Sequence, residues 1–121
     1  MSTALQIQPD TYGVLGPSLA TLRGRWEAVE VAADALAELA QLGTHDIEIA
    51  REKEPDFGAL HGAPHADLIA QAVADLAAMM QPGLRALIAI ASEGRRADAA
   101  AATLWHEYAE ARAAIAELCN R

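Results

Sequence analysis

Histidine and glutamate side chains at helical spacing are the residues of this 121-residue chain that could bind a metal. His61 and His65 are four apart, as are His106 and Glu110, and that spacing places two side chains on one helical face. Imidazole and carboxylate ligands suit Zn²⁺ or Fe. The alternative is two separate solvated pairs. A glycine and a proline interrupt the first pair, and the Glu-x-x-His pairs of di-iron bundles are absent. We therefore assign no cofactor.

Trp105 lies beside His106, one position off an apolar stripe. It could complete a small-molecule pocket with the histidines, or lie at a subunit interface, where tryptophan is enriched. A partly buried position at the edge of the core is the third interpretation. The candidate ligand or metal residues are therefore His61, His65, Trp105, His106 and Glu110.

Two groups of charged residues could also bind a ligand. A carboxylate row that could bind a cation or a basic peptide consists of Glu27, Glu30, Asp34 and Glu38. Two arginine pairs, Arg23/Arg25 and Arg95/Arg96, could bind a phosphate or carboxylate if the fold brought them together. The simpler interpretation of both groups is a solvated surface. Because the sequence contains no phosphate loop, no recognisable nucleophile and no second carboxylate cluster, we predict that the protein is not an enzyme.

Apolar residues repeat with alternating spacings of four and three in two long stretches. The first is Leu15, Leu19, Leu22, Trp26, Val29, Ala33, Leu36 and Ala40. The second is Ala97, Ala101, Leu104, Tyr108, Ala111, Ile115 and Leu118. Such spacing puts one apolar stripe along one side of a helix, and the stripe must be buried against other helices. The stripes therefore predict an all-α fold, a compact bundle of about four to five helices.

Turn and cap residues give the expected boundaries. We expect long helices over about 17–42, 65–80 and 96–118, and shorter ones over about 45–54 and 84–93. Gly43 and Gly94 suit the left-handed residue that ends a helix. Thr44 suits an N-cap, Pro55 ends the helix before it, and Pro82-Gly83 separates two helices. Residues 1–16 are expected to be an irregular arm, and residues 17–121 a single helical domain.

The loop over residues 55–64 contains two apolar residues, Phe57 and Leu60, which we expect to anchor it on the core. Alanine supplies almost half of the 53% apolar content, and the basic residues are eight arginines and one lysine. That composition is typical of GC-rich bacterial genomes. It equally suits close packing of helices, and both origins stay open.

Net charge and cysteine content limit the classes of partner. The formal net charge of −8 disfavours binding to nucleic acid or to anionic membrane. The single cysteine, Cys119, excludes a disulfide framework and fits a reducing compartment. The apolar stretch 76–91 is too short and too interrupted to be expected to span a bilayer. The first ten residues lack a signal-peptide pattern, so we expect a cytoplasmic protein.

Association with another protein is the function that this sequence favours. Long striped helices without a chemical motif suggest a homo-oligomer, with a dimer favoured, or a subunit or adapter of a larger assembly. A bundle with an internal small-molecule or metal pocket is the alternative. A transcription-associated regulator is the second alternative, and the acidic charge opposes it.

Overall fold

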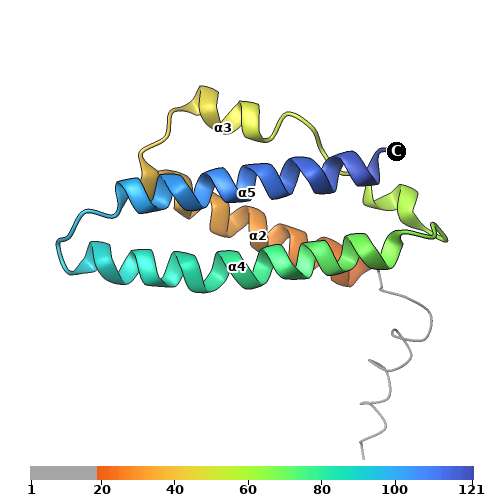
Figure 1. The fold of residues 1–121 in the computed structure, drawn as a ribbon, viewed down its shortest axis with the longest axis horizontal. Helices are drawn as coiled ribbons and strands as arrows, with labels where there is room; N and C mark the ends of the chain where they lie inside the picture. The colour runs from red at the N-terminus through yellow and green to blue at the C-terminus, as the bar shows by residue number, and fades with distance from the viewer. Residues whose placement is uncertain (1–18) are drawn as a thin grey trace, which may run out of the picture.

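The computed structural model describes residues 19–121, so the predicted arm over 1–16 lies outside the described residues. Three long helices form a bundle: α2 (Leu19–Ala40), α4 (Ala66–Ser92) and α5 (Asp98–Cys119). A short helix, α3 (Thr44–Ala50), and a 3-10 turn, η1 (Phe57–Leu60), lie in the connection between α2 and α4 (Figure 1). Residues 19–121 contain no strand, and the all-α bundle is confirmed.

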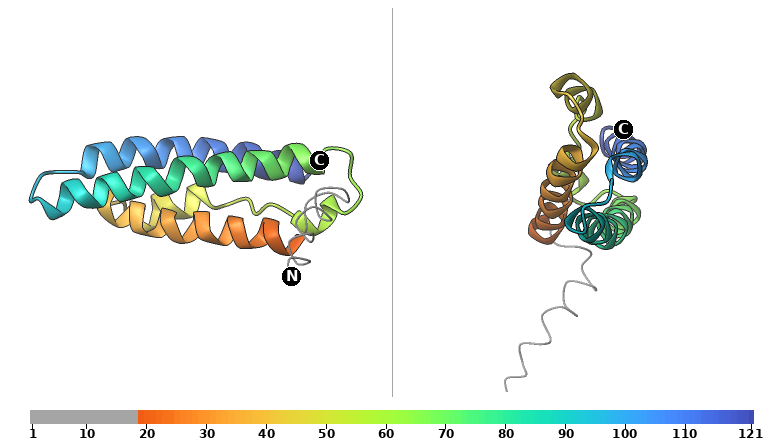
Figure 2. Two further views of the ribbon diagram at one scale, coloured as in Figure 1. Left: turned by 90° about the horizontal axis from the view of Figure 1, so that it is seen from below. Right: turned by 90° about the vertical axis from the view of Figure 1, so that its left-hand side faces the viewer.

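Each long helix packs against the other two. Seen end-on, α2, α4 and α5 occupy the corners of a triangle, and α3 stands on the side formed by α2 and α5 (Figure 2). From Leu22 to Leu36 the α2 stripe lies inside this triangle as predicted, with Ala33 and Leu36 fully buried. Leu15, the first residue of the predicted stripe, lies outside the described residues. Leu19, at the start of α2, is 43% exposed. Because small residues such as Ala33 and Ala101 are fully buried, the helices can approach one another closely.

The buried side of α5 differs from the predicted stripe. Leu104, Ala111 and Leu118 are only half-buried, whereas Trp105 and Arg112 are buried. The buried arc is rotated because α5 contacts α3 and η1 as well as α2 and α4. A stripe defined by apolar residues also could not include a charged residue such as Arg112.

α4 runs without a break through Pro82, so the predicted division into helices 65–80 and 84–93 is wrong. A proline inside a helix removes one hydrogen bond and costs about 3 kcal/mol. Packing on both sides of it offsets that cost, since Met80 and Leu87 are buried. Gly83 supports the continuous path. A Cβ atom at this position would lie 2.7 Å from Cδ2 of Leu104, so glycine permits close contact with α5.

The continuity of α4 also contradicts the expectation that the apolar stretch 76–91 is too short and too interrupted to span a bilayer. Among the helices of residues 19–121, α4 is long enough and apolar enough to cross a membrane, judged by length and composition alone. It nevertheless packs against both α2 and α5, as a core helix of a bundle does.

The left-handed residue that ends α2 is not the predicted one. Gln41, and not Gly43, adopts the left-handed conformation, with φ of 60°. The backbone N–H of Gln41 donates to Glu38 O and that of Leu42 donates to Ala37 O, both at 3.1 Å, which is the Schellman pattern. Gly43 is extended and precedes α3, which has no side-chain cap from Thr44. Gly94, with φ of 78°, ends α4 as predicted.

Replacing Gln41 with glycine is expected to stabilise the protein by about 0.5–1 kcal/mol. A left-handed conformation costs a residue with a Cβ about 1–2 kcal/mol, and glycine's larger unfolded-state entropy offsets part of the gain. Urea denaturation followed by circular dichroism measures the change. Gly94→Ala is the matched control, because a Cβ there meets nothing within 4 Å and only φ opposes it. It should destabilise, and equal stability of both variants with wild type would contradict the argument.

α3 ends at Ala50, four residues before the predicted end at Glu54. The reason lies in the contacts of the following residues. Arg51 reaches across to α2 and α5, and the carbonyl oxygen of Lys53 accepts a hydrogen bond from Arg112 of α5. These contacts hold residues 51–54 against the bundle in a conformation that a continuing helix would not allow. In the loop that follows, Phe57 and Leu60 are buried, which confirms their predicted anchoring role.

Candidate functional site

The first predicted histidine pair lies at the end of the bundle where α4 begins. His65 is half-buried at the N-cap position of α4, and His61 is exposed at the end of η1. The Nε2 atom of His65 is 3.2 Å from the carbonyl oxygen of Leu118, and as the donor it must carry the proton. His65 therefore ties the start of α4 to the last turn of α5.

The second predicted pair lies elsewhere on the surface. His106 Nε2 is 3.3 Å from Glu110 Oε2, and their side chains are 74% and 72% exposed. Leu118, the contact of His65, lies twelve residues further along α5, which corresponds to about 18 Å of helix. The two pairs are therefore not brought together. No group of three or more potential metal ligands occurs within residues 19–121.

Trp105 belongs to the core of the described residues, whereas His61 and His106 are exposed. Its side chain is 7% exposed, and its ring centroid lies 4.9 Å from that of Tyr108, with an interplanar angle of 50°. Edge and tilted arrangements of this kind are favoured between aromatic rings. Trp105 therefore supplies bulk between α5 and its neighbours, beside a polar cluster that the sequence analysis missed.

That cluster is centred on Arg112, whose side chain is 1% exposed. Its Nε donates to Glu30 Oε1 at 2.9 Å, and its two terminal nitrogens donate to Lys53 O at 2.6 Å and to Glu54 Oε2 at 3.1 Å. Its guanidinium carbon lies 5.4 Å from the ring centroid of Trp26, a cation–π distance. One side chain of α5 thus binds α2 and the connection that follows α3.

Arg51 completes the cluster from the other side. It donates to Tyr108 Oη at 3.1 Å, to Asp34 Oδ1 at 2.7 Å and to the carbonyl oxygen of Glu30 at 2.9 Å. Tyr108 in turn donates its hydroxyl proton to Glu30 Oε2. We call these residues the Arg112 cluster: Glu30, Asp34, Arg51, Glu54, Tyr108 and Arg112. It fastens α3 and residues 51–54 onto α2 and α5.

The electrostatics of the cluster follow from burial and pairing. Burial raises the pKa of Tyr108 to about 12, and the hydrogen bond to Glu30 acts in the same direction, against the influence of Arg51. Burial by itself would lower the pKa of Arg51 and of Arg112. Their hydrogen bonds and attraction to neighbouring groups outweigh it, so both values rise. Both arginines are therefore fully charged, and Tyr108 is neutral at physiological pH.

The raised pKa of Tyr108 predicts a loss of stability at high pH. Because the folded state disfavours the ionised phenolate, this stabilisation is complete below the unfolded pKa of about 10. It is lost as pH rises through the folded pKa of about 12. Urea denaturation across this window should show wild-type stability falling more steeply with pH than that of Tyr108→Phe. Parallel curves for the two proteins would contradict the placement of this hydroxyl.

The chemistry of the Arg112 cluster is structural. Every buried side-chain polar atom of residues 19–121 has a hydrogen-bond partner, so no buried donor or acceptor of the cluster is unpaired. One sequence signal pointed to it. Arg112 follows Tyr108 by four positions and Trp105 by seven, so it continues a row on the same side of α5. Glu30 was assigned to a solvated row, although its side chain is only 20% exposed.

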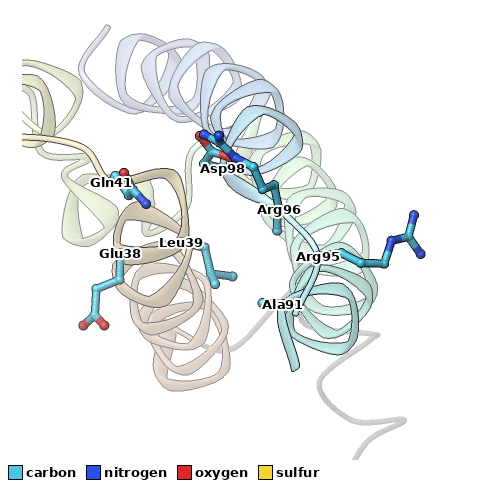
Figure 3. Close-up of a pocket in the computed structure, with 8 residues that line it drawn as sticks. Glu38, Leu39, Gln41, Ala91, Arg95, Arg96 and Asp98 are labelled. Carbon is cyan, nitrogen blue, oxygen red and sulfur yellow. The ribbon is translucent and has the colours of Figure 1, made fainter. Parts of the chain in front are cut away.

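The two arginine pairs do not meet. Arg23 and Arg25 lie in the first turns of α2, whereas Arg95 and Arg96 lie near its other end. There, a pocket of about 300 Å³ is lined by Glu38, Leu39, Gln41, Ala91, Arg95, Arg96, Ala97 and Asp98 (Figure 3). Arg96 is bound by Asp98 at 2.9 Å, and Arg95 points away from the pocket. The four guanidinium groups therefore do not come together to form an anion-binding site.

Cys119 is buried in the last turn of α5. Burial raises the pKa of its thiol to about 11, and nearby Asp56 adds to the effect. A thiol that stays protonated at neutral pH is a poor nucleophile. Cys119 therefore acts as a packing residue.

The described residues thus hold a buried ionic cluster occupied by its own partners and a small pocket at one end of the bundle. No protein-family model matches the chain, and no curated protein or solved structure is significantly similar to it.

Proposed function

We propose that this protein acts by association with a second copy of itself, as a non-enzymatic homodimer. The exposure of α4 carries the proposal. In the most apolar 18-residue stretch of this helix, only 22% of the residues are buried within the bundle. Leu68 and Ile88 of α4 are 60% and 49% exposed, and Val31 of α2 is 62% exposed.

Exposed apolar surface favours association because burial removes it from water. Of the large apolar side chains that are exposed, two belong to α4, two to α2 and one, Ile49, to α3. α3 stands on the side formed by α2 and α5 (Figure 2). The alanines that separate the larger apolar residues let a second set of helices approach closely. The net charge of −8 suits a defined and soluble assembly over open-ended aggregation.

The other function classes have less support. An internal metal or ligand pocket would need the two histidine pairs to converge, and about 18 Å of helix separates them. A transcription-associated role would need a basic surface, which a chain of this charge does not favour. Location in the cytoplasm belongs to the proposal and is supported by the presence of a single cysteine, Cys119, which leaves no disulfide within the chain.

Sedimentation equilibrium of the full chain across a wide concentration range tests the proposal. We expect a species of twice the monomer mass of 12.8 kDa, with a smooth transition to monomer on dilution. Light scattering after gel filtration should give the same mass. A monomer at every concentration would overturn the proposal. If the chain is a monomer that forms a complex only with a different protein, the homodimer would be overturned in favour of a heteromeric complex.

A further inference from the structure

The connection between α2 and α4 contains a segment that places no side chain fully in the core. Every residue from 43 to 56 is exposed or half-buried, whereas Phe57, directly after them, is buried. We call residues 43–56 the strap. It includes α3, which has no buried residue and stands apart from the three long helices (Figure 1). Ile47 and Ala50 are its apolar contacts with the core, and both are only half-buried.

One side chain attaches the middle of the strap to the bundle. The two terminal nitrogens of Arg51 donate to Asp34 Oδ1 at 2.7 Å and to the carbonyl oxygen of Glu30 at 2.9 Å. Its Nε donates to Tyr108 Oη at 3.1 Å. Arg51 therefore joins the strap to α2 and to α5 at the same time.

Polar contacts with α5 and the residue after it attach the second half of the strap. Arg112 donates to the carbonyl oxygen of Lys53 and to the carboxylate of Glu54. Asn120 donates to the carbonyl oxygen of Glu54 and accepts the backbone N–H of Asp56. The strap is thus held mainly by hydrogen bonds and ion pairs, and the bundle mainly by apolar packing.

Contacts of these two kinds resist opening to different extents. When the strap leaves the bundle, the charged groups of each ion pair regain water, which offsets much of the interaction that is lost. Asp34 and Glu54 are already 65% and 72% exposed, so their pairs are solvated even in the closed state. Separating α2, α4 and α5 would instead expose the buried apolar core to water. Local opening of the strap therefore needs less free energy than unfolding of the bundle.

We propose that the strap opens as a unit while α2, α4 and α5 stay packed, and that Arg51 is its latch. Phe57 limits the opening, because it is buried directly after the strap and keeps η1 on the bundle. Opening withdraws Lys53 and Glu54 from Arg112. Two nitrogens of a side chain that is 1% exposed in the closed state then face solvent. The strap thereby controls access to Arg112.

The chain's one lysine makes the opening measurable, because Lys53 lies in the strap. A lysine-specific protease can cut only the bond between Lys53 and Glu54, and the carbonyl oxygen of that bond is held by Arg112. Cleavage therefore follows the population of the open state. We expect wild type to be cut at a rate that urea, well below the unfolding midpoint, changes little, because strap opening exposes little surface. The activity of the protease on an unstructured lysine peptide corrects for effects of urea on the enzyme.

Variants of the latch should speed this cleavage. We expect at least about tenfold faster cleavage of Arg51→Gln, which loses charged hydrogen bonds to both helices. Asp34→Ala removes one latch contact from an exposed position on α2 and should be cut about threefold faster. Glu27→Ala is the matched control. Glu27 is an exposed carboxylate of the same helix that makes no hydrogen bond or ion pair within the described part of the chain, so cleavage should keep the wild-type rate.

Two results would overturn the proposal. If cleavage of wild type rises with urea as steeply as global unfolding does, the strap opens only when the whole chain unfolds. If Arg51→Gln is cut no faster than wild type, Arg51 is not the latch. Circular dichroism reports whether Arg51→Gln keeps its helices. If it does not, Asp34→Ala and Glu27→Ala decide, and equal cleavage rates for these two variants would overturn the latch.

Discussion

Replacing Arg112 with alanine is expected to lower the free energy of unfolding by about 2–3 kcal/mol, because the Glu30 carboxylate loses a charged hydrogen-bond donor and keeps only Tyr108 and Arg51, the latter at 3.3 Å. Three groups lose their hydrogen bond to Arg112: the carboxylates of Glu30 and Glu54 and the carbonyl oxygen of Lys53. Glu30 is the costliest of these because its side chain is only 20% exposed. Urea denaturation followed by circular dichroism measures the loss, and the midpoint should fall without a change in slope.

Arg96→Ala is the control for the removal of an arginine that forms an ion pair. Arg96 binds Asp98 at 2.9 Å, but its side chain is 85% exposed. Exposed pairs of this kind contribute about 0–1 kcal/mol, so this variant should be nearly as stable as wild type. Arg112→Met separates packing from charge, because methionine retains an apolar stem over Trp26 but cannot pair with Glu30. It should be destabilised less than Arg112→Ala. If Arg112→Ala lowered the free energy of unfolding no more than Arg96→Ala does, the buried position of Arg112 in the cluster would be contradicted.

Truncation of Trp26 to alanine is the second change with a large expected effect, about 3–5 kcal/mol of lost stability. Trp26 is 8% exposed and lies at the point where α2, η1 and α5 meet. Its ring contacts Phe57 edge-on, with centroids 5.3 Å apart, and lies beneath the guanidinium of Arg112. The truncation leaves a cavity that several rigid elements border, so collapse can fill it only in part. Urea denaturation measures the loss, and circular dichroism is the signal because one of two tryptophans is removed.

Leu19→Ala is the control for the loss of a large apolar side chain from α2. Leu19 is 43% exposed at the first described turn, so its truncation should cost less than about 1 kcal/mol. A double-mutant cycle of Trp26→Ala and Arg112→Met isolates the contact between the two side chains. We expect a coupling free energy of about 0.5–2 kcal/mol. Additive effects would show that the tryptophan and the guanidinium do not interact, and would leave only the packing of Trp26 to explain its effect.

The helices could be predicted to the extent that local rules decide them. The α2 stripe, the end of α4 at Gly94 and the anchoring of Phe57 and Leu60 are confirmed because each depends on apolar periodicity or on a nearby turn residue. The end of α2 was misplaced by two residues. Gln41 adopts the left-handed conformation because the backbone hydrogen bonds to Glu38 and Ala37 form there, although a glycine stands two residues later.

Tertiary packing explains why the predicted break in α4 and the predicted end of α3 are wrong. Pro82 predicts a break, but the residues around it are held between α2 and α5, and the helix continues. α3 stops before the predicted end because residues 51–54 contact side chains from two other helices. In both cases a tertiary contact outweighs a local preference of about 1–3 kcal/mol.

Apolar periodicity alone predicts a bundle of amphipathic helices, because the period of the apolar residues specifies which side of each helix must be buried. Which polar groups meet inside the bundle depends instead on how the helices pack. Arg112 and Glu30 are 82 residues apart and belong to different helices, and each alone has the pattern of a surface charge. Their pairing depends on the rotation and register of α5 against α2. Periodicity within one helix carries no information about its rotation or register against another helix. The Arg112 cluster therefore cannot be predicted from the sequence pattern.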